Sequence, residues 1–157
     1  MNNTELIEAF FTAFAKGNAE EMITCYHKDV TFQDPAFGTL KGDRAKQMWQ
    51  MLLSQKSAAP VVSFSDVISL GDNMVGAKWR AKYFYGPKKR KVINHVKAVF
   101  TIKDVKIHKH TDSFNLWKWS RQAIGPVGFA IGWTPMMKAK IQSIANGKLD
   151  SYINKVA

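Results

Sequence analysis

The spacing of hydrophobic residues changes at Pro60, and no other feature constrains the fold as strongly. Before Pro60, apolar residues recur at three- and four-residue intervals, as they do along one face of an α-helix. From Pro60 onwards they alternate with polar residues, as they do in β-strands that bury one face. Helices followed by a run of strands are typical of α+β folds, in which the helices cover one face of an antiparallel sheet. We therefore expect an α+β domain.

The segment before Pro60 is expected to contain three helices and one strand. A first helix covers the apolar positions from Leu6 to Phe14, and a second follows Asn18, a good helix-capping residue. A strand at residues 30–35 precedes a third helix, which begins at Asp43. The residues expected on the apolar sides of the second and third helices are Met22, Ile23 and Tyr26, and Ala45, Met48, Trp49, Leu52 and Leu53.

Four strands are expected after Pro60, at residues 61–70, 74–85, 92–103 and 105–114. Short turns connect them, which predicts an antiparallel meander. In the second strand Lys78, Arg80 and Lys82 alternate with apolar side chains, so one face of the sheet should be wet and basic. A last helix is expected to begin at Thr134 and Pro135, with these inward-facing residues: Met137, Ile141, Ile144 and Leu149.

The composition is typical of one domain with one hydrophobic core. The chain has 157 residues, of which 46% are hydrophobic. Its one cysteine, Cys25, cannot form an internal disulfide, and the N-terminus lacks the basic and apolar regions of a signal peptide. The stretch from Ala123 to Trp133 is weakly polar, but glycine and proline interrupt it and it is too short to span a bilayer. We therefore expect a cytoplasmic protein without a transmembrane helix.

The formal net charge of the whole chain is +11, and the positive charge is concentrated in its second half. Residues 1–77 contain six Lys or Arg and nine Asp or Glu, whereas residues 78–157 contain 17 and three. A run of four basic residues, from Lys88 to Lys91, adds to the basic strand face. This asymmetry fits an anionic partner, whether nucleic acid, a membrane surface or an acidic ligand, and it equally fits a solvated basic surface. No nucleic-acid-binding motif accompanies the charge.

Residues 107–119, IHKHTDSFNLWKW, combine alternating titratable residues with two tryptophans. On a strand, His108, His110 and Asp112 would share a face because side chains alternate with a period of two. We expect His110 and Asp112 to approach the interior and to pair with each other or with His95 on the neighbouring strand. Such a pair could transfer protons near neutral pH, or it could simply be a satisfied polar ladder. A metal would need more ligands, so we expect no metal and no other cofactor.

A second titratable group is expected at the end of the strand at residues 30–35. Asp34 shares a strand face with Val30 and Phe32, so its carboxylate should enter an apolar cavity. Desolvation would raise the pKa of this carboxyl and suit it to proton transfer. The alternative is structural, since an Asp before Pro35 is also a good turn former.

Two segments, TCYHKDVTFQDPAFGTLKG and FTIKDVKIHKHTDSF, resemble the SnoaL-like branch of the nuclear-transport-factor-two-like superfamily. The resemblance covers about residues 4–116 and implies a cystatin-like cone, in which three N-terminal helices pack on a curved antiparallel sheet. Residues 117–157 would then form a helical extension of this single domain, which spans residues 1–157. Members of the superfamily include isomerases, cyclases, epoxide hydrolases, dehydratases and non-catalytic binding proteins. The resemblance also implies a homodimer that pairs through the outer face of the sheet.

The resemblance implies roles for several residues. Asp34 falls on the general base of ketosteroid isomerases, but Phe10 replaces their tyrosine, and their second aspartate falls near Asn94 or Ala98. Asp112 falls on an aspartate of epoxide hydrolases, whose arginine corresponds to Arg80 and whose second carboxylate is missing. The catalytic candidates are therefore Asp34, His110, Asp112 and His95, and the residues expected to contact the ligand are Phe10, Tyr26, Phe32, Trp49, Trp79 and Asn94.

The extension offers two interpretations. Trp117, Trp119, Phe129 and Trp133 could cap the open end of the cone and deepen an apolar pocket, or they could lie with nearby Lys and Arg at an anionic membrane surface. Capping is favoured, because so many exposed apolar groups would promote aggregation. The sequence as a whole favours a protein that binds a small lipophilic ligand, as an isomerase or lyase or as a non-catalytic dimeric binding or scaffold protein.

Overall fold

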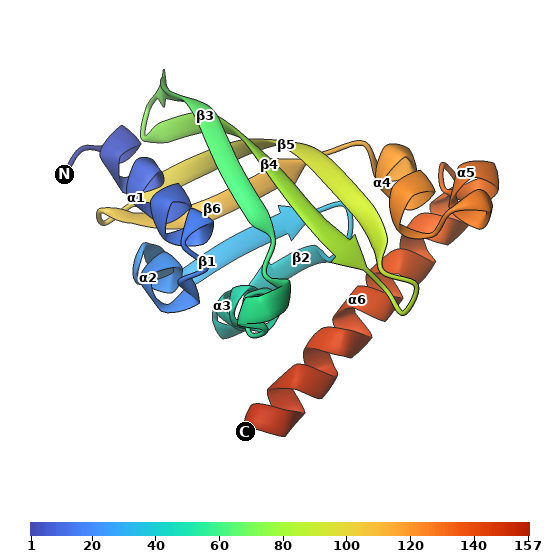
Figure 1. The fold of residues 1–157 in the computed structure, drawn as a ribbon. Helices are drawn as coiled ribbons and strands as arrows, with labels where there is room; N and C mark the ends of the chain where they lie inside the picture. The colour runs from blue at the N-terminus through green and yellow to red at the C-terminus, as the bar shows by residue number, and fades with distance from the viewer.

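A computed structural model describes residues 1–157 as three helices packed on a curved six-stranded sheet, with a helical unit at one end (Figure 1). The N-terminal helices are α1 (Asn3–Ala15), α2 (Ala19–Thr24) and α3 (Asp43–Leu52). The strands are β1 (Tyr26–Asp34), β2 (Gly38–Lys41), β3 (Val61–Gly71), β4 (Met74–Tyr85), β5 (Arg90–Lys103) and β6 (Lys106–Ser113). A short 3₁₀ helix, η1 (Lys56–Ala58), links α3 to β3. This is the expected α+β cone.

The order of strands in the sheet is β2-β1-β6-β5-β4-β3. Strands β3 to β6 form the expected antiparallel meander, and β2 also pairs with β1 in an antiparallel arrangement. The remaining contact, between β1 and β6, is parallel: Phe32 lies opposite His110, and Gln33 lies opposite Thr111. This pairing brings the Asp34 end of β1 beside the Asp112 end of β6.

Local signals in the sequence explain where the first helices begin. Asn2 and Glu5 form a capping box, in which each side chain accepts a hydrogen bond from the other residue's backbone N–H. Gly17 ends the first helical segment with a positive φ of 71°, a conformation that glycine adopts without strain. The Asn18 side chain then accepts a hydrogen bond from the Glu21 N–H and starts α2.

Three details of the expected core are wrong. Tyr26 belongs to β1 rather than to α2, because Cys25 caps the helix and the chain extends from Tyr26 to pair with β6. Leu52 is exposed, because α3 ends there and the chain turns to bury Leu53 instead. Ile144 is also exposed, since α6 packs on the rest of the molecule through Ile141 and Leu149.

The alternation of side chains along β6 is interrupted once. Thr101 lies opposite Lys109 and Ile102 lies opposite Ile107, so His108 is an extra residue in β6. As a result Ile107 and His110 are both fully buried, although they are three residues apart. His108 is half-buried and its ring packs against that of His27, with 5.1 Å between centroids. The expectation that His108 shares a face with His110 is therefore wrong.

The extension consists of α4 (Leu116–Ala123), α5 (Pro126–Ile131) and α6 (Pro135–Val156). Helix α5 packs closely on α4 at Gly128, where an added Cβ would lie 2.1 Å from the Ser120 carbonyl oxygen. Helix α6 begins at the expected Thr134 cap and runs back past α3 and the turn between β1 and β2 (Figure 1). No helix combines the length and the apolar character that crossing a membrane requires.

Candidate functional site

Five side chains from four elements form a largely buried chain of hydrogen bonds. Trp49 Nε1 on α3 lies 2.8 Å from the Tyr26 hydroxyl on β1, which lies 2.8 Å from His110 Nδ1 on β6. His110 Nε2 lies 2.8 Å from Asp112 Oδ1, and Trp79 Nε1 on β4 donates to the same oxygen at 3.2 Å. The expected pairing of His110 with Asp112 is confirmed.

The chemistry of the end groups gives this chain a direction. An indole N–H can only donate, so the Tyr26 oxygen accepts from Trp49, and in the Nε2–H tautomer of His110 the Tyr26 hydroxyl donates to Nδ1. Nε2 of His110 then carries the hydrogen and donates it to Asp112. Asp112 thus accepts two hydrogen bonds on Oδ1, which fixes the orientation of its carboxylate.

Aromatic rings enclose the imidazole of His110. Phe100 lies 4.3 Å from it between ring centroids, Phe32 lies at 5.0 Å and Phe10 at 5.5 Å. These rings are almost fully buried and pack on one another. The expectation that Phe10 and Phe32 contact a ligand is therefore wrong, because their side chains fill the narrow end of the cone. His110 and the Tyr26 hydroxyl lie within the same packed layer.

Asp34 lies where β1 ends and turns into β2. Its Oδ1 accepts hydrogen bonds from the backbone N–H groups of Ala36, at 2.9 Å, and Phe37, at 2.6 Å, so the expected turn role is real. Burial raises the pKa of this carboxyl from its ordinary value of 3.8 to about 7. The Phe37 hydrogen bond lowers this pKa, the negative charge of Asp112 raises it, and the Ala36 hydrogen bond lowers it. Asp34 therefore changes its charge near neutral pH.

Asp34 and Asp112 both keep an oxygen free of protein hydrogen bonds. The bonds to Asp112 end on Oδ1, and those to Asp34 also end on Oδ1. No fully sealed side-chain oxygen or nitrogen lacks a partner in this structure, so Oδ2 of Asp112 must border accessible space. Asp34 is thus a partly buried carboxyl whose pKa is raised by the charge of Asp112.

Tyr83 on β4 is a third polar group at this end, and sequence reasoning did not select it. Its hydroxyl accepts a hydrogen bond of 2.7 Å from Trp119 Nε1 and donates none within the protein. Burial raises its pKa to about 12, the Trp119 hydrogen bond lowers it, and the nearby charge of Asp34 also raises it. The hydroxyl therefore stays protonated and has a hydrogen to donate. The inward direction of the Tyr83 side chain follows from strand alternation. Its hydroxyl hydrogen stays available because the hydroxyl accepts from Trp119, a residue outside the sheet.

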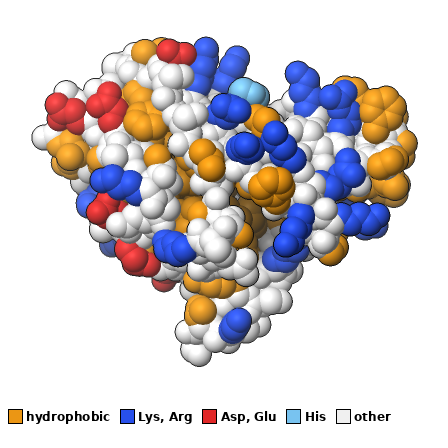
Figure 2. Space-filling view, viewed as in Figure 1, with side chains coloured by type: hydrophobic (Ala, Val, Ile, Leu, Met, Phe, Trp, Pro, Cys, Tyr) orange, Lys and Arg blue, Asp and Glu red, His pale blue; other side chains and the backbone are white.

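Figure 2 shows that the molecule is hollowed between the sheet and the helices of the extension, with hydrophobic side chains inside the hollow. Several side chains at this end are only partly buried: Asp34, Trp79, Tyr83 and Asn94 in the sheet, and Phe114 directly after β6. Trp119 packs on Tyr85 with a centroid separation of 5.1 Å, so the extension does cover part of this end. The opening is visible at the molecular surface, and both apolar and polar side chains line it.

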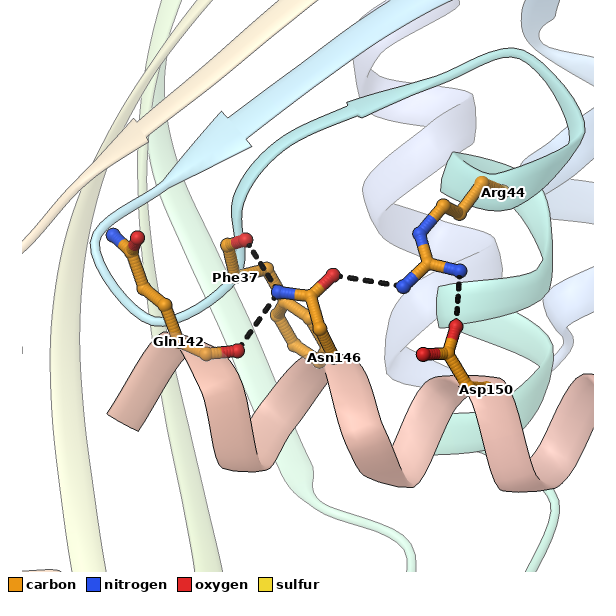
Figure 3. A network of polar contacts seen from close by, with 5 residues as sticks. All are labelled: Phe37, Arg44, Gln142, Asn146 and Asp150. Atoms are coloured by element: carbon orange, nitrogen blue, oxygen red, sulfur yellow. Dashed lines mark hydrogen bonds and ion pairs between the residues drawn. The ribbon is translucent and has the colours of Figure 1, made fainter. Parts of the chain in front are cut away.

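Helix α6 is bound to the rim of this opening by side-chain hydrogen bonds (Figure 3). Asn146 Nδ2 donates to the Phe37 carbonyl oxygen at 2.9 Å, and Gln142 Nε2 donates to the Pro35 carbonyl oxygen at 3.1 Å. On α3, Arg44 donates to Asn146 at 2.8 Å and forms an ion pair of 2.6 Å with Asp150. These contacts place α6 directly beside the turn that holds Asp34.

Two expected site residues lie on the opposite face of the sheet. His95 is exposed and lies opposite Arg80, because the odd-numbered residues of this part of β5 face outwards. The residues of β5 opposite Asp112 and His110 are Ala98 and Phe100. The expectation that His95 pairs with His110 or Asp112 is therefore wrong, and Arg80 cannot join two carboxylates inside the cone. Nowhere do three His, Cys, Asp or Glu side chains converge as metal ligands would.

Comparison with known families agrees with this architecture. A model of the SnoaL-like domain matches residues 7–110, well over half of the chain. The chain belongs to the SnoaL-like domain family. The matched SnoaL-like core contains Asp34 and ends at His110, so Asp112 and the helices of the extension lie beyond it. Among curated proteins, no sequence matches the chain.

Solved structures share the SnoaL-like fold at low sequence identity. An LEH-like epoxide hydrolase from M. tuberculosis is 17% identical, with a TM-score of 0.65 over 82% of this chain and 94% of that one. A candidate polyketide cyclase from Pseudomonas putida is 18% identical, with a TM-score of 0.64 over 78% and 98%. A candidate isomerase from Bacillus subtilis is 15% identical, with a TM-score of 0.61 over 80% and 96%. At these identities the likeness concerns the fold alone.

Proposed function

We propose that the protein binds a small lipophilic molecule at the wide end of the cone and moves a proton on it, as an isomerase or a lyase does. The observation that carries this proposal is the carboxyl of Asp34, which is partly buried beside Asp112 and has a pKa of about 7. A proton carrier is most effective when its pKa is close to the working pH. Asp34 meets this condition and also borders an opening lined by both apolar and polar side chains.

In the proposed reaction, the Asp34 carboxylate takes a proton from a carbon next to a carbonyl group. The electron pair of the broken C–H bond moves towards the carbonyl oxygen, where negative charge develops. The free hydroxyl hydrogen of Tyr83 supports this oxygen, because donors aimed at developing charge stabilise it strongly in a site shielded from water. Return of the proton to another carbon gives an isomer, whereas loss of a leaving group gives an elimination product.

The buried chain ending at Asp112 has a positioning role in this proposal. His110 and Trp79 both donate to Asp112 Oδ1 and hold the carboxylate in one orientation. The charge of Asp112 in turn raises the pKa of Asp34. His110 itself does not touch the ligand, because aromatic rings surround it.

The test begins with native mass spectrometry of gently purified protein, followed by denaturing extraction of any retained molecule. Proton transfer is then measured as deuterium uptake from heavy water into a panel of lipophilic ketones and enones, together with the extracted molecule. We expect uptake to increase as the pH rises through about 7, because Asp34 must be ionised to act as a base. Asp34→Asn should lower the rate at least about 100-fold. Tyr83→Phe should lower it about 100-fold.

Asp29→Asn is the matched control, since Asp29 lies on the same strand and is exposed. Its rate should equal that of the wild type. Equal rates for the wild type, Asp34→Asn, His110→Ala and Asp112→Asn would show that the site is wrongly assigned. A retained lipophilic molecule that stays chemically unchanged and takes up no deuterium would instead support the alternative, a non-catalytic binding protein. The complete hydrogen bonding of His110 within the core is the observation that favours this alternative.

A further inference from the structure

Exposed apolar side chains form a patch on α5 and the start of α6. The patch consists of Val127, Phe129, Ile131, Trp133 and Met136, of which Phe129, Trp133 and Met136 are 59%, 71% and 73% exposed. Figure 2 shows hydrophobic side chains gathered at the edge of the molecule that α5 occupies in Figure 1. Single exposed apolar residues are common on soluble proteins, whereas a contiguous group of large ones marks an interaction surface.

Internal contacts hold the aromatic members of this patch in place. Trp117 Nε1 donates to the Phe129 carbonyl oxygen at 2.9 Å, and Trp133 Nε1 donates to the Ala130 carbonyl oxygen at 3.1 Å. The Trp117 and Phe129 rings also pack together, with 5.7 Å between centroids. Because each indole N–H already has an acceptor, these rings can leave water without losing a hydrogen bond.

The surroundings of the patch are basic and contain no acidic side chain from this part of the chain. Residues 113–149 include no Asp or Glu and five Lys or Arg. Four of these, Lys118, Arg121, Lys138 and Lys140, are exposed on the helices that carry or support the patch. The Arg121 guanidinium lies 4.7 Å from the centre of the Trp117 ring. Figure 2 shows Lys and Arg side chains around the apolar edge.

We propose that this patch docks the protein on the surface of an anionic phospholipid bilayer. Aromatic and aliphatic side chains would enter the boundary between headgroups and acyl chains, and the surrounding cations would contact anionic headgroups. The combination distinguishes this partner from nucleic acid, which binds a basic surface without requiring large exposed aliphatic residues. The absence of a helix able to cross a membrane is consistent with a protein that lies on the surface.

The test is co-sedimentation of the full chain with vesicles of phosphatidylcholine, with and without about 30% phosphatidylserine, at about 100 mM salt. We expect binding to the anionic vesicles to be at least about tenfold tighter than to the neutral ones. The double substitution Phe129→Ser and Trp133→Ser should weaken binding about tenfold or more, because it removes the apolar contact. Lys138→Glu with Lys140→Glu should weaken binding to anionic vesicles by about fivefold or more per residue.

Controls use comparably exposed residues that do not belong to the extension. Phe84→Ser, at a side chain that is 64% exposed, and Lys103→Glu should leave vesicle binding unchanged. Circular dichroism confirms that each variant is folded. The proposal is wrong if the wild type does not bind anionic vesicles even at about 50 mM salt, where electrostatic attraction is strong. It is also wrong if the Phe129/Trp133 variant binds like the wild type, since the contact would then be electrostatic only, or if Phe84→Ser weakens binding as much.

Discussion

The carboxyl of Asp34 is placed where its charged form is disfavoured, so its protonation is coupled to folding. Its pKa is about 7 in the folded protein and close to 3.8 when the chain unfolds. Between these values the folded state binds the proton more tightly, so the stability that Asp34 contributes is greatest below pH 3.8 and decreases as the pH rises to about 7. Above about pH 7, Asp34 no longer contributes this stability.

We therefore predict that Asp34→Asn stabilises the protein at about pH 8, by about 2–4 kcal/mol, while it abolishes proton transfer. The amide has no charge to bury, and its oxygen can still accept the hydrogen bonds from Ala36 and Phe37. At about pH 4 the two proteins should differ little. Urea unfolding at the two pH values measures the difference, with Asp29→Asn as control. A variant that is destabilised at both pH values would contradict the raised pKa.

The Tyr26 hydroxyl connects Trp49 on α3 to His110 on β6 through two hydrogen bonds. We predict that Tyr26→Phe destabilises the fold by about 2–4 kcal/mol, because it leaves both the Trp49 N–H and His110 Nδ1 buried without partners. The phenylalanine keeps the packing of the ring. Chemical unfolding should show this loss, whereas Tyr152→Phe, at a hydroxyl that makes no hydrogen bond within the protein, should change stability little. A loss below about 0.5 kcal/mol for Tyr26→Phe would show that the chain is not stabilising.

Single residues of the site differ in how far the sequence predicts them. Strand alternation was enough to predict the His110 and Asp112 pair, since the two are neighbours on one face. Tyr26 reaches His110 from 84 residues away, through a parallel pairing that no local pattern encodes. The prediction for His95 is wrong because side chains alternate along β5: the even-numbered residues Val96, Ala98 and Phe100 point into the cone, so His95 points outwards.

At the scale of elements, the strongly periodic segments are where the sequence predicts them. Hydrophobic residues recur with a period of two in the four meander strands and with a period of 3.6 in α1. Each of these elements buries one face, so the period alone predicts its type. Helices α4 and α5 were not expected as separate elements. The segment around them contains Gly125, Pro126, Gly128 and Gly132, and its helices form because they pack on each other rather than because of propensity.

Helix α6 is held on the rim of the cone by polar contacts as well as by apolar packing, and the polar contacts can be removed one at a time. We predict that Asn146→Ala makes amide hydrogen exchange faster in residues 142–156 and leaves β4 and β5 unchanged. The substitution removes the donor to the Phe37 carbonyl and one acceptor of Arg44, at a cost of about 1–3 kcal/mol to local stability. Exchange measured by mass spectrometry resolves the two regions.

Asn154→Ala is the control for this prediction, because Asn154 lies on the same helix, is exposed and makes no side-chain hydrogen bond. Its exchange pattern should match that of the wild type. If Asn146→Ala also left α6 unchanged, apolar packing by Ile141 and Leu149 alone would hold the helix in place.

For the whole molecule, the positive charge on the outer face of the sheet affects how two copies can associate through that face. The outer face of the sheet carries Lys78, Arg80, Lys82, Lys91 and Lys97, all exposed, while Asp66 already pairs with Lys78 at 3.4 Å. A shallow depression of about 410 Å³ on this face is also lined by basic residues, among them Arg80 and Lys97. A homodimer through this face stays a prediction, and it would bring like charges together.

We therefore predict that any self-association through this face strengthens with salt. Raising the salt concentration from about 50 mM to 500 mM should increase the dimer fraction, because screening reduces the repulsion. Analytical ultracentrifugation measures this change, and Arg80→Ser should produce a similar shift at low salt. A dimer that weakens as salt increases would point to another interface.

The parallel pairing of β1 with β6 also has a consequence for the time at which the site is completed. During synthesis α1, α2 and β1 leave the ribosome first, but the strand that joins β1 to the meander is the last of the six. Until residue 113 has emerged, the edge of β1 has no partner in the meander and the aromatic face of α1 lacks His110 beneath it. Closing such a long loop is slow compared with forming a local hairpin, so the cone is completed late in folding.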